Sequence, residues 1–264
     1  MKHINQTFRA AMGMAIAGIF GSAALAQQSI TTFTGISYSQ DFNTLATTGS
    51  NLTTPLPANW LLSENGSTTA GNYNADNGSA TGNNLYSYGS TGSSERALGS
   101  LRSGTGAPNN IFGIIFVNNT GVTVTSLYIG YTGEQWRQGS QTDVDRLDFQ
   151  YNSNATTLFA GTWNDFDGLD FSSPNTTSGT GALVGNNSGN FTLKGAFITG
   201  LSIPHGQSFG IRWRDSDSTS TDDGLAIDDL IVMVPEPAVP AALAGVGLFG
   251  LLAWQRRRGN RTHF

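Results

Sequence analysis

The sequence predicts an all-β protein, a two-sheet antiparallel sandwich of the jelly-roll kind with a targeting segment at either end. Residues 27–234 show short alternating or apolar runs separated by clusters of Gly, Asn, Ser and Thr, without a helical period of useful length. Both ends instead carry uncharged apolar runs beside basic residues, as targeting segments do. We therefore expect three parts: residues 1–26, 27–234 and 235–264.

The first part has the pattern of a signal peptide. Lys2 and Arg9 precede a mainly apolar run at residues 10–25, and Ala24 and Ala26 supply small residues at the positions that signal peptidase requires. Cleavage after Ala26 would start the mature chain at Gln27. An uncleaved membrane anchor is the alternative, and the Gly and Ser content of the run argues against it.

The last part reads as a short transmembrane helix with a motif before it. Residues 238–254 carry no charge, and at 1.5 Å per residue they span about 26 Å, close to a hydrocarbon core of about 30 Å. The arginines at 256–258 would stay in the cytoplasm, which leaves the middle part outside. A buried core helix is the alternative.

The order of motif, apolar helix and arginine cluster resembles the PEP-CTERM sorting signal of Gram-negative bacteria, with Pro235, Glu236 and Pro237 as the matching motif. The resemblance covers about the last thirty residues. It implies transient anchoring in the inner membrane, recognition and cleavage by an exosortase, and transfer to the cell envelope, the cell surface or an extracellular (biofilm) matrix.

Composition limits the partners of the middle part. Residues 27–234 contain seven basic and seventeen acidic residues, a formal charge of −10. Such a surface repels nucleic acid and favours cations and neutral partners. The chain has no cysteine, and its middle part is long enough to bury a core without disulfides.

Several strands are visible in this part. Residues 146–151 and 209–214 alternate apolar and polar side chains, while residues 111–117 are almost continuously apolar and predict a strand buried on both faces. Within residues 121–131 the apolar side chains change from even-numbered to odd-numbered positions, so we expect a bulge or bend near Thr125 or Ser126. Residues 63–81 and 172–190 read as long loops.

Acidic residues give the strongest local signal. Asp215, Asp217, Asp222 and Asp223 fall in a predicted loop, where they are either ligands of Ca²⁺ or another hard cation, or ordinary solvated acids.

Asp228 and Asp229 interrupt the final apolar strand, so one of them must share a face with apolar neighbours. A carboxylate buried there requires a cation or an arginine, and Arg146 and Arg212 are the candidates.

The first and last strands resemble those of concanavalin-like and carbohydrate-binding jelly rolls. The residues that carry this resemblance are 39–43 and 227–230. It implies a structural Ca²⁺ shared by Asp41 and Asp228.

Aromatic residues suggest a glycan site. Trp136, Trp163, Tyr86 and Tyr88 stand in polar surroundings, the first two in predicted loops, and exposed aromatic rings with polar flanks bind sugars. Burial in the core is the alternative for each of them.

Catalysis is disfavoured. The middle part has one histidine, His205, in a Pro-Gly turn, and no nucleophile elbow accompanies it. A glycosidase needs two carboxylates that face the sugar, and the nearest candidates are Asp143, Asp145 and Asp148. Asp143 and Asp145 share a strand face, while Asp148 points away. We therefore expect no enzyme, but an exported adhesion or matrix protein that binds extracellular polysaccharide. The alternatives are a purely structural envelope protein and a glycan-cleaving enzyme.

Overall fold

The computed structural model describes residues 27–32, 35–64, 71–104, 109–139, 144–177, 179–216 and 221–235. The predicted signal peptide, Glu236, Pro237, the apolar helix and the arginine cluster lie outside these ranges, and those predictions stay predictions. Within the described ranges, no helix is both long and apolar enough to cross a bilayer.

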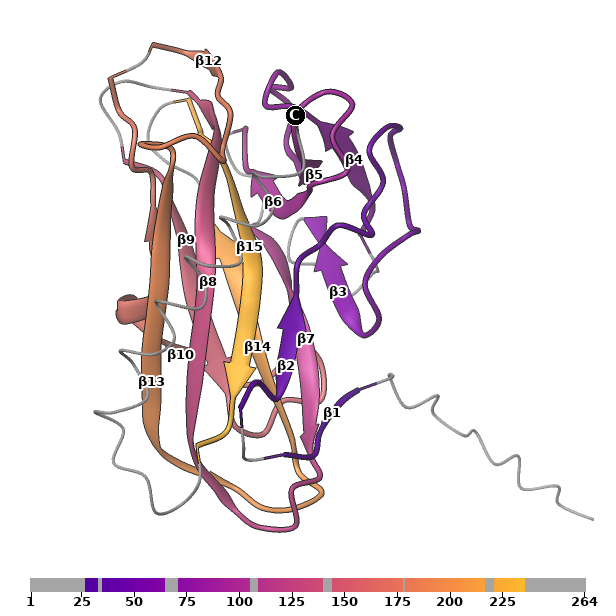
Figure 1. Cartoon of the computed structure of the whole chain (residues 1–264), viewed down its shortest axis with the longest axis vertical. Helices are drawn as coiled ribbons and strands as arrows, with labels where there is room; N and C mark the ends of the chain where they lie inside the picture. Colours follow the sequence, from indigo (N-terminus) through magenta and orange to yellow (C-terminus); the bar gives the residue numbers. More distant parts are fainter. Residues whose placement is uncertain are drawn as a thin grey trace, which may run out of the picture.

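The described chain folds into two sheets that pack face to face (Figure 1). The first sheet has the order β1-β7-β14-β9-β10, with β3 paired to β7 and β11 paired to β9. Its strands are β1 (Gln28–Ile30), β3 (Trp60–Ser63), β7 (Asn110–Asn118), β9 (Arg146–Asn152), β10 (Asn164–Asp165), β11 (Phe171–Ser172) and β14 (Ser208–Asp215).

The second sheet has the order β12-β8-β15-β6-β5-β4, with β13 paired to β8 and β2 paired to β15. Its strands are β2 (Tyr38–Gln40), β4 (Tyr73–Asp76), β5 (Asn84–Tyr88), β6 (Ala97–Leu101), β8 (Val124–Gln138), β12 (Gly181–Ala182), β13 (Phe191–Ile203) and β15 (Gly224–Met233). A short 3₁₀ helix, η2, covers Asp167–Leu169. The prediction of an all-β sandwich is confirmed, and the pairs β1–β7 and β4–β5 are parallel exceptions to its antiparallel pattern.

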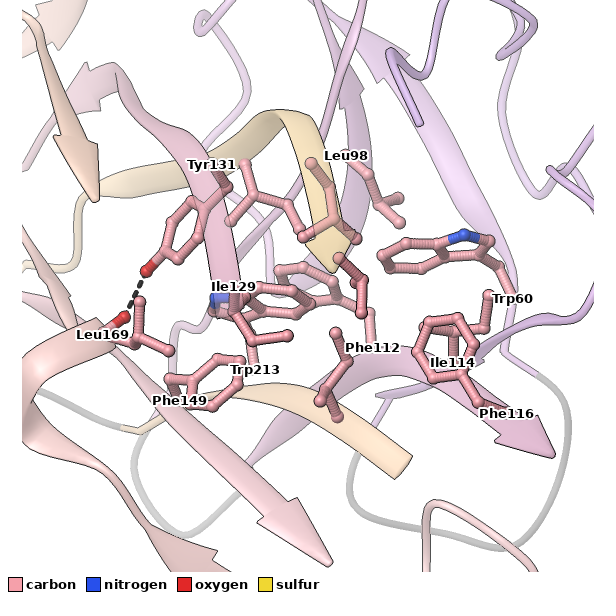
Figure 2. Packing of buried hydrophobic residues seen from close by; sticks show 14 of the residues in the cluster. Trp60, Leu98, Phe112, Ile114, Phe116, Ile129, Tyr131, Phe149, Leu169 and Trp213 are labelled. Carbon is pink, nitrogen blue, oxygen red and sulfur yellow. Dashed lines mark hydrogen bonds between the residues drawn. The ribbon is translucent and has the colours of Figure 1, made fainter. Parts of the chain in front are cut away.

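Trp213 lies at the centre of the core between the sheets (Figure 2). Its indole stacks on Phe112 with ring centroids 5.9 Å apart, and it meets Phe149 and Tyr131 edge to face at 5.3 Å each. The Tyr131 hydroxyl donates a hydrogen bond to the Leu169 carbonyl, which ties η2 to β8. The aromatic core thus joins both sheets and the connection beside them.

The predicted strand patterns are confirmed. Strands β9 and β14 point their alternating apolar side chains into the core. Strand β7 is buried on both faces, because Phe112 faces the core and Ile115 belongs to a second apolar cluster. The expected irregularity near Thr125 and Ser126 is present too, because regular pairing of β8 with β13 breaks between Ser126 and Val124.

Two predictions from polar composition are wrong. Residues 63–81 are not wholly a loop, because Tyr73 is buried, begins β4 and donates its hydroxyl to the Pro55 carbonyl. Trp136 is not in a loop either, since β8 continues to Gln138. Neighbouring strands and side-chain hydrogen bonds satisfy the polar residues there, so their presence does not end the strand.

We predict that Trp213→Ala lowers the free energy of unfolding by about 3–5 kcal/mol, because it removes the ring on which the inter-sheet core packs. Chemical denaturation measures this. Val144, which is 59% exposed, supplies the control, and Val144→Ala changes stability by less than about 0.5 kcal/mol. Equal effects of the two substitutions would contradict a core centred on Trp213.

Candidate functional site

A bulge in β15 decides which of its two central acids is buried. Pairing of β15 with β8 shifts between Asp228 and Ile231, and Asp229 has a left-handed backbone with φ of 50°. The extra residue lets both Ile227 and Leu230 face the core. Asp228 is therefore on the outer face of the sheet, next to Ala226, and it is 4% exposed.

Two glutamates meet Asp228 on this outer face. One carboxylate oxygen from each of Glu95, Glu134 and Asp228 lies within 4.8 Å of the other two. Glu134 is on β8, paired with Ala226, and is fully buried, whereas Glu95 precedes β6 and is partly exposed. We call these three residues the first acid group.

Neither of the two arginines predicted as partners neutralises Asp228. Burial raises the pKa of Asp228 well above its ordinary value, and the carboxylates of Asp229, Glu134 and Glu95 raise it further. The predicted arginine partners are engaged elsewhere in the described structure: Arg146 pairs with Asp148 and Asp170, and Arg212 lies over the Trp163 ring.

Hydrogen bonds hold each acid of the group in place. The Asp229 N–H donates to Asp228 Oδ1 at 2.7 Å, the Trp136 Nε1–H donates to Glu134 Oε2 at 3.0 Å, and the Asn186 amide donates to Glu95. Three carboxylates that converge in this way favour a ligand that supplies positive charge. Oxygen donors without His or Cys suit a hard cation such as Ca²⁺, so the donor set fits that ion.

The loop after β12 covers this site. Gly185 lies against the Trp136 indole so closely that a Cβ there would come within 2.4 Å of Nε1. Only glycine allows the loop to approach in this way, and the approach brings Asn186 to Glu95. A hollow of about 270 Å³ remains at the edge of this cover, lined by Trp136, Thr91 and Val184 among others.

Three of the four aromatic residues predicted to bind a ligand are buried beside the first acid group. Trp136, Tyr86 and Tyr88 are 1–2% exposed. Tyr88 stacks on Tyr86 at 5.0 Å and on Trp136 at 6.2 Å, so these rings contact one another and form an apolar cluster separate from the core and from the cluster around Ile115. The structure gives them a packing role.

Trp163 is different. Its ring is partly exposed, its Nε1–H donates to the Ala160 carbonyl at 3.1 Å, and the Arg212 guanidinium lies 4.2 Å from its centroid. The exposed Asn164 and Asp165 follow it. This is the mixture of ring surface and polar side chains that sugars bind.

The sequence placed a metal on Asp41 and Asp228, and the structure brings Asp228 to other acids. Asp41 is exposed, its Oδ1 accepts the Asn43 N–H at 3.2 Å, and it is not one of the three converging acids. The sequence pattern did not connect Glu95 or Glu134 with a metal site. Glu134 and Trp136 are two residues apart on β8, so they point to the same face, and this spacing was the available signal for the burial of Glu134.

Comparisons with known proteins leave the family open. No protein-family model and no curated protein matches the chain. Among solved structures, the K3 cleaved adhesin domain of Lys-gingipain from Porphyromonas gingivalis W83 is 13% identical, with 74% of this chain and 95% of that one covered at a TM-score of 0.40. The CBM22-1 xylan-binding domain of Paenibacillus barcinonensis Xyn10C is 9% identical, with 80% and 99% covered at a TM-score of 0.38. Likenesses at this level carry no argument about function.

Proposed function

We propose that this chain is an exported, exosortase-sorted surface or extracellular-matrix protein, whose β-sandwich binds carbohydrate without catalysis and is stabilised by Ca²⁺. The sorting pattern, the charge of −10 on residues 27–234 and the sandwich fold support the setting. The observation that carries the binding role is the partly exposed ring of Trp163 among polar side chains.

The Trp163 surface suits a neutral sugar. Arg212 is held in place because its Nε–H donates to Gln150 at 2.7 Å and its Nη1–H donates to the Leu158 carbonyl. Gln150 in turn donates to Asp165 at 2.6 Å. A rigid platform with fixed donors and acceptors loses little entropy on binding, which favours recognition of a flexible polysaccharide.

The first acid group supports a structural cation better than a catalytic pair. A glycosidase needs two carboxylates that reach the sugar, about 5 Å apart in retaining enzymes. Glu134 and Asp228 are 0% and 4% exposed, so a substrate has no access to them. His205 is in an exposed turn, where its Nδ1 accepts the Gly121 N–H, as its sequence context predicts.

A purely structural envelope protein is the second candidate. The burial of Trp136, Tyr86 and Tyr88 favours it, because three of the four predicted ligand residues stabilise the fold instead of facing a ligand.

Carbohydrate binding is tested with a glycan array, followed by titration of the best glycan or of extracellular polysaccharide from the producing cells. We predict that Trp163→Ala weakens binding at least about tenfold while the melting temperature changes little, since a sugar-stacking ring contributes as a hot spot.

Val184 supplies a matched control, because it is 41% exposed and lines the hollow near Trp136. Val184→Ala leaves the affinity unchanged if Trp163 is the platform. Loss of binding in Val184→Ala alone would move the site to the hollow. An array without any bound glycan would favour the structural candidate.

Calcium binding is tested by thermal unfolding with calcium and with excess chelator. At a concentration of one hundred times Kd, a cation that binds only the folded chain raises the free energy of unfolding by about 2.7 kcal/mol. This corresponds to roughly 5–10 °C in melting temperature for a chain of this size. We predict that Asp228→Asn reduces this gain, because Asp228 converges with Glu95 and Glu134. Asp41→Asn leaves it unchanged, and the reverse order would assign the cation to Asp41.

Sorting is tested in a host that carries an exosortase. We predict that Glu236→Ala leaves an uncleaved chain in the inner-membrane fraction, because the substitution removes the charge of the Pro-Glu-Pro motif. An immunoblot of membrane and extracellular fractions measures this. Gln255→Ala, a polar substitution outside the motif, is processed normally, and normal processing of both variants would contradict the sorting assignment.

A further inference from the structure

Strand β8 carries a buried hydroxyl group that has no hydrogen-bond partner. Thr132 is 0% exposed, and its Oγ1 makes no hydrogen bond in the described structure. A threonine hydroxyl can donate one hydrogen bond and accept two, and folded proteins satisfy nearly all such groups when they bury them. A hydroxyl in this state is best explained by a partner from outside the described chain, such as an ion.

Thr132 points to the outer face of the second sheet, where the first acid group lies. Its neighbours in sequence, Tyr131 and Gly133, both face the core. Tyr131 packs there, and a Cβ added to Gly133 would come within 2.3 Å of the Phe171 ring. Because side chains alternate along a strand, the Thr132 side chain faces the opposite way.

The register of the sheet sets Thr132 beside two acids of the group. It pairs with Asp228 on β15, and it stands two residues before Glu134 on β8. Directly opposed residues of an antiparallel pair share a face, and their Cβ atoms are about 4.5–5.5 Å apart. The Thr132 side chain is therefore a direct neighbour of the Asp228 and Glu134 side chains.

The other strand neighbours of Thr132 on this face are apolar or have no side chain. Leu193 is its partner on the opposite side, in β13. The residues next along the three strands are Gly130, Phe191, Gly195, Ala226 and Ile231. The acids are thus the polar groups beside the hydroxyl on these strands, so a partner for the hydroxyl lies on their side.

The Thr132 hydroxyl does not hydrogen-bond to these acids, although it is their neighbour. Ligands of one Ca²⁺ each lie about 2.4 Å from it, so they can be up to about 4.8 Å from one another, farther than a hydrogen bond reaches. The carboxylate oxygens of Glu95, Glu134 and Asp228 converge within that limit. Neighbouring oxygens that share an ion do not need to hydrogen-bond to each other.

The acids that the sequence predicted in a loop before the last strand do not form a comparable group. Asp215, Asp222 and Asp223 are 0–2% exposed, so they are not solvated, but they are not among the converging acids of the described chain. Asp217 lies outside the described residues. Converging acids and an unpaired buried hydroxyl are found together at Thr132.

We propose that the Thr132 hydroxyl oxygen is a ligand of the cation at the first acid group, together with the carboxylates of Glu95, Glu134 and Asp228. The inference rests on the Ca²⁺ of the proposed function and adds a ligand that the acids alone do not reveal. A neutral oxygen adds to the coordination shell without adding charge repulsion, and Ca²⁺ takes about six to eight oxygens of mixed kind. Strand pairing fixes the hydroxyl beforehand, so little order is lost when the ion binds.

Calcium titration of the purified full-length chain by isothermal calorimetry tests this assignment. We expect Thr132→Val, which replaces the hydroxyl by a methyl group of similar size, to weaken Ca²⁺ binding at least about tenfold. Thr132→Ser keeps the hydroxyl and most of the affinity. Thr125→Val, at an exposed position of the same strand, leaves the affinity unchanged.

Thermal unfolding in excess chelator separates a ligand from a residue that only stabilises the fold. Without the ion, Thr132→Val melts no lower than the wild-type chain, because the substitution removes a buried hydroxyl that has no hydrogen bond. A purely structural Thr132 would give the reverse result, which is unchanged Ca²⁺ affinity and a lower melting temperature in chelator.

Unchanged Ca²⁺ affinity in folded Thr132→Val would overturn the inference and leave the calcium site to the acids alone. Thr132→Ala takes its place if circular dichroism shows that Thr132→Val does not fold. Failure of the calcium site itself has another signature: the wild-type chain then binds no Ca²⁺, or Asp228→Asn binds it as tightly as the wild-type chain does. The inference about Thr132 would fail with it.

Discussion

This structure depends on one constraint, which is that side chains point alternately to the two faces of a strand even when both edges of that strand are paired. Strand β15 pairs with β8 along one edge and with β6 and β2 along the other, so nearly every side chain on it is buried on one face or the other. A strand that is paired along both edges cannot turn to bring a charged side chain toward solvent. The bulge at Asp229 keeps Ile227 and Leu230 in the core, and the consequence is a buried Asp228 on the outer face.

Buried charge then sets the requirements for the rest of the molecule. The first acid group lies on the outer face of the second sheet, where Glu134 and Asp228 are buried. Removing carboxylates from water costs far more than a fold of marginal stability can lose, unless cations or protons compensate. A cation at the first acid group would join segments distant in sequence, in a chain that has no cysteine for the purpose.

Much of the fold could be predicted because period-two patterns report a half-buried strand directly. Strands β9 and β14 and the irregularity in β8 follow from parity alone. Strand β4 and the end of β8 could not be predicted this way, because hydrogen bonds from distant segments satisfy their polar residues. For the site, parity singled out Asp228, but its neighbours Glu95 and Glu134 depend on how β8 and β15 pair, which a single sequence does not specify.

Elemental analysis of the full-length chain, purified in calcium-containing buffer and freed of unbound ions by gel filtration, tests the central claim most directly. The account predicts one calcium ion per chain, at the first acid group. A chain that retains well under one equivalent of calcium, or of any other divalent metal, while keeping its fold would contradict it.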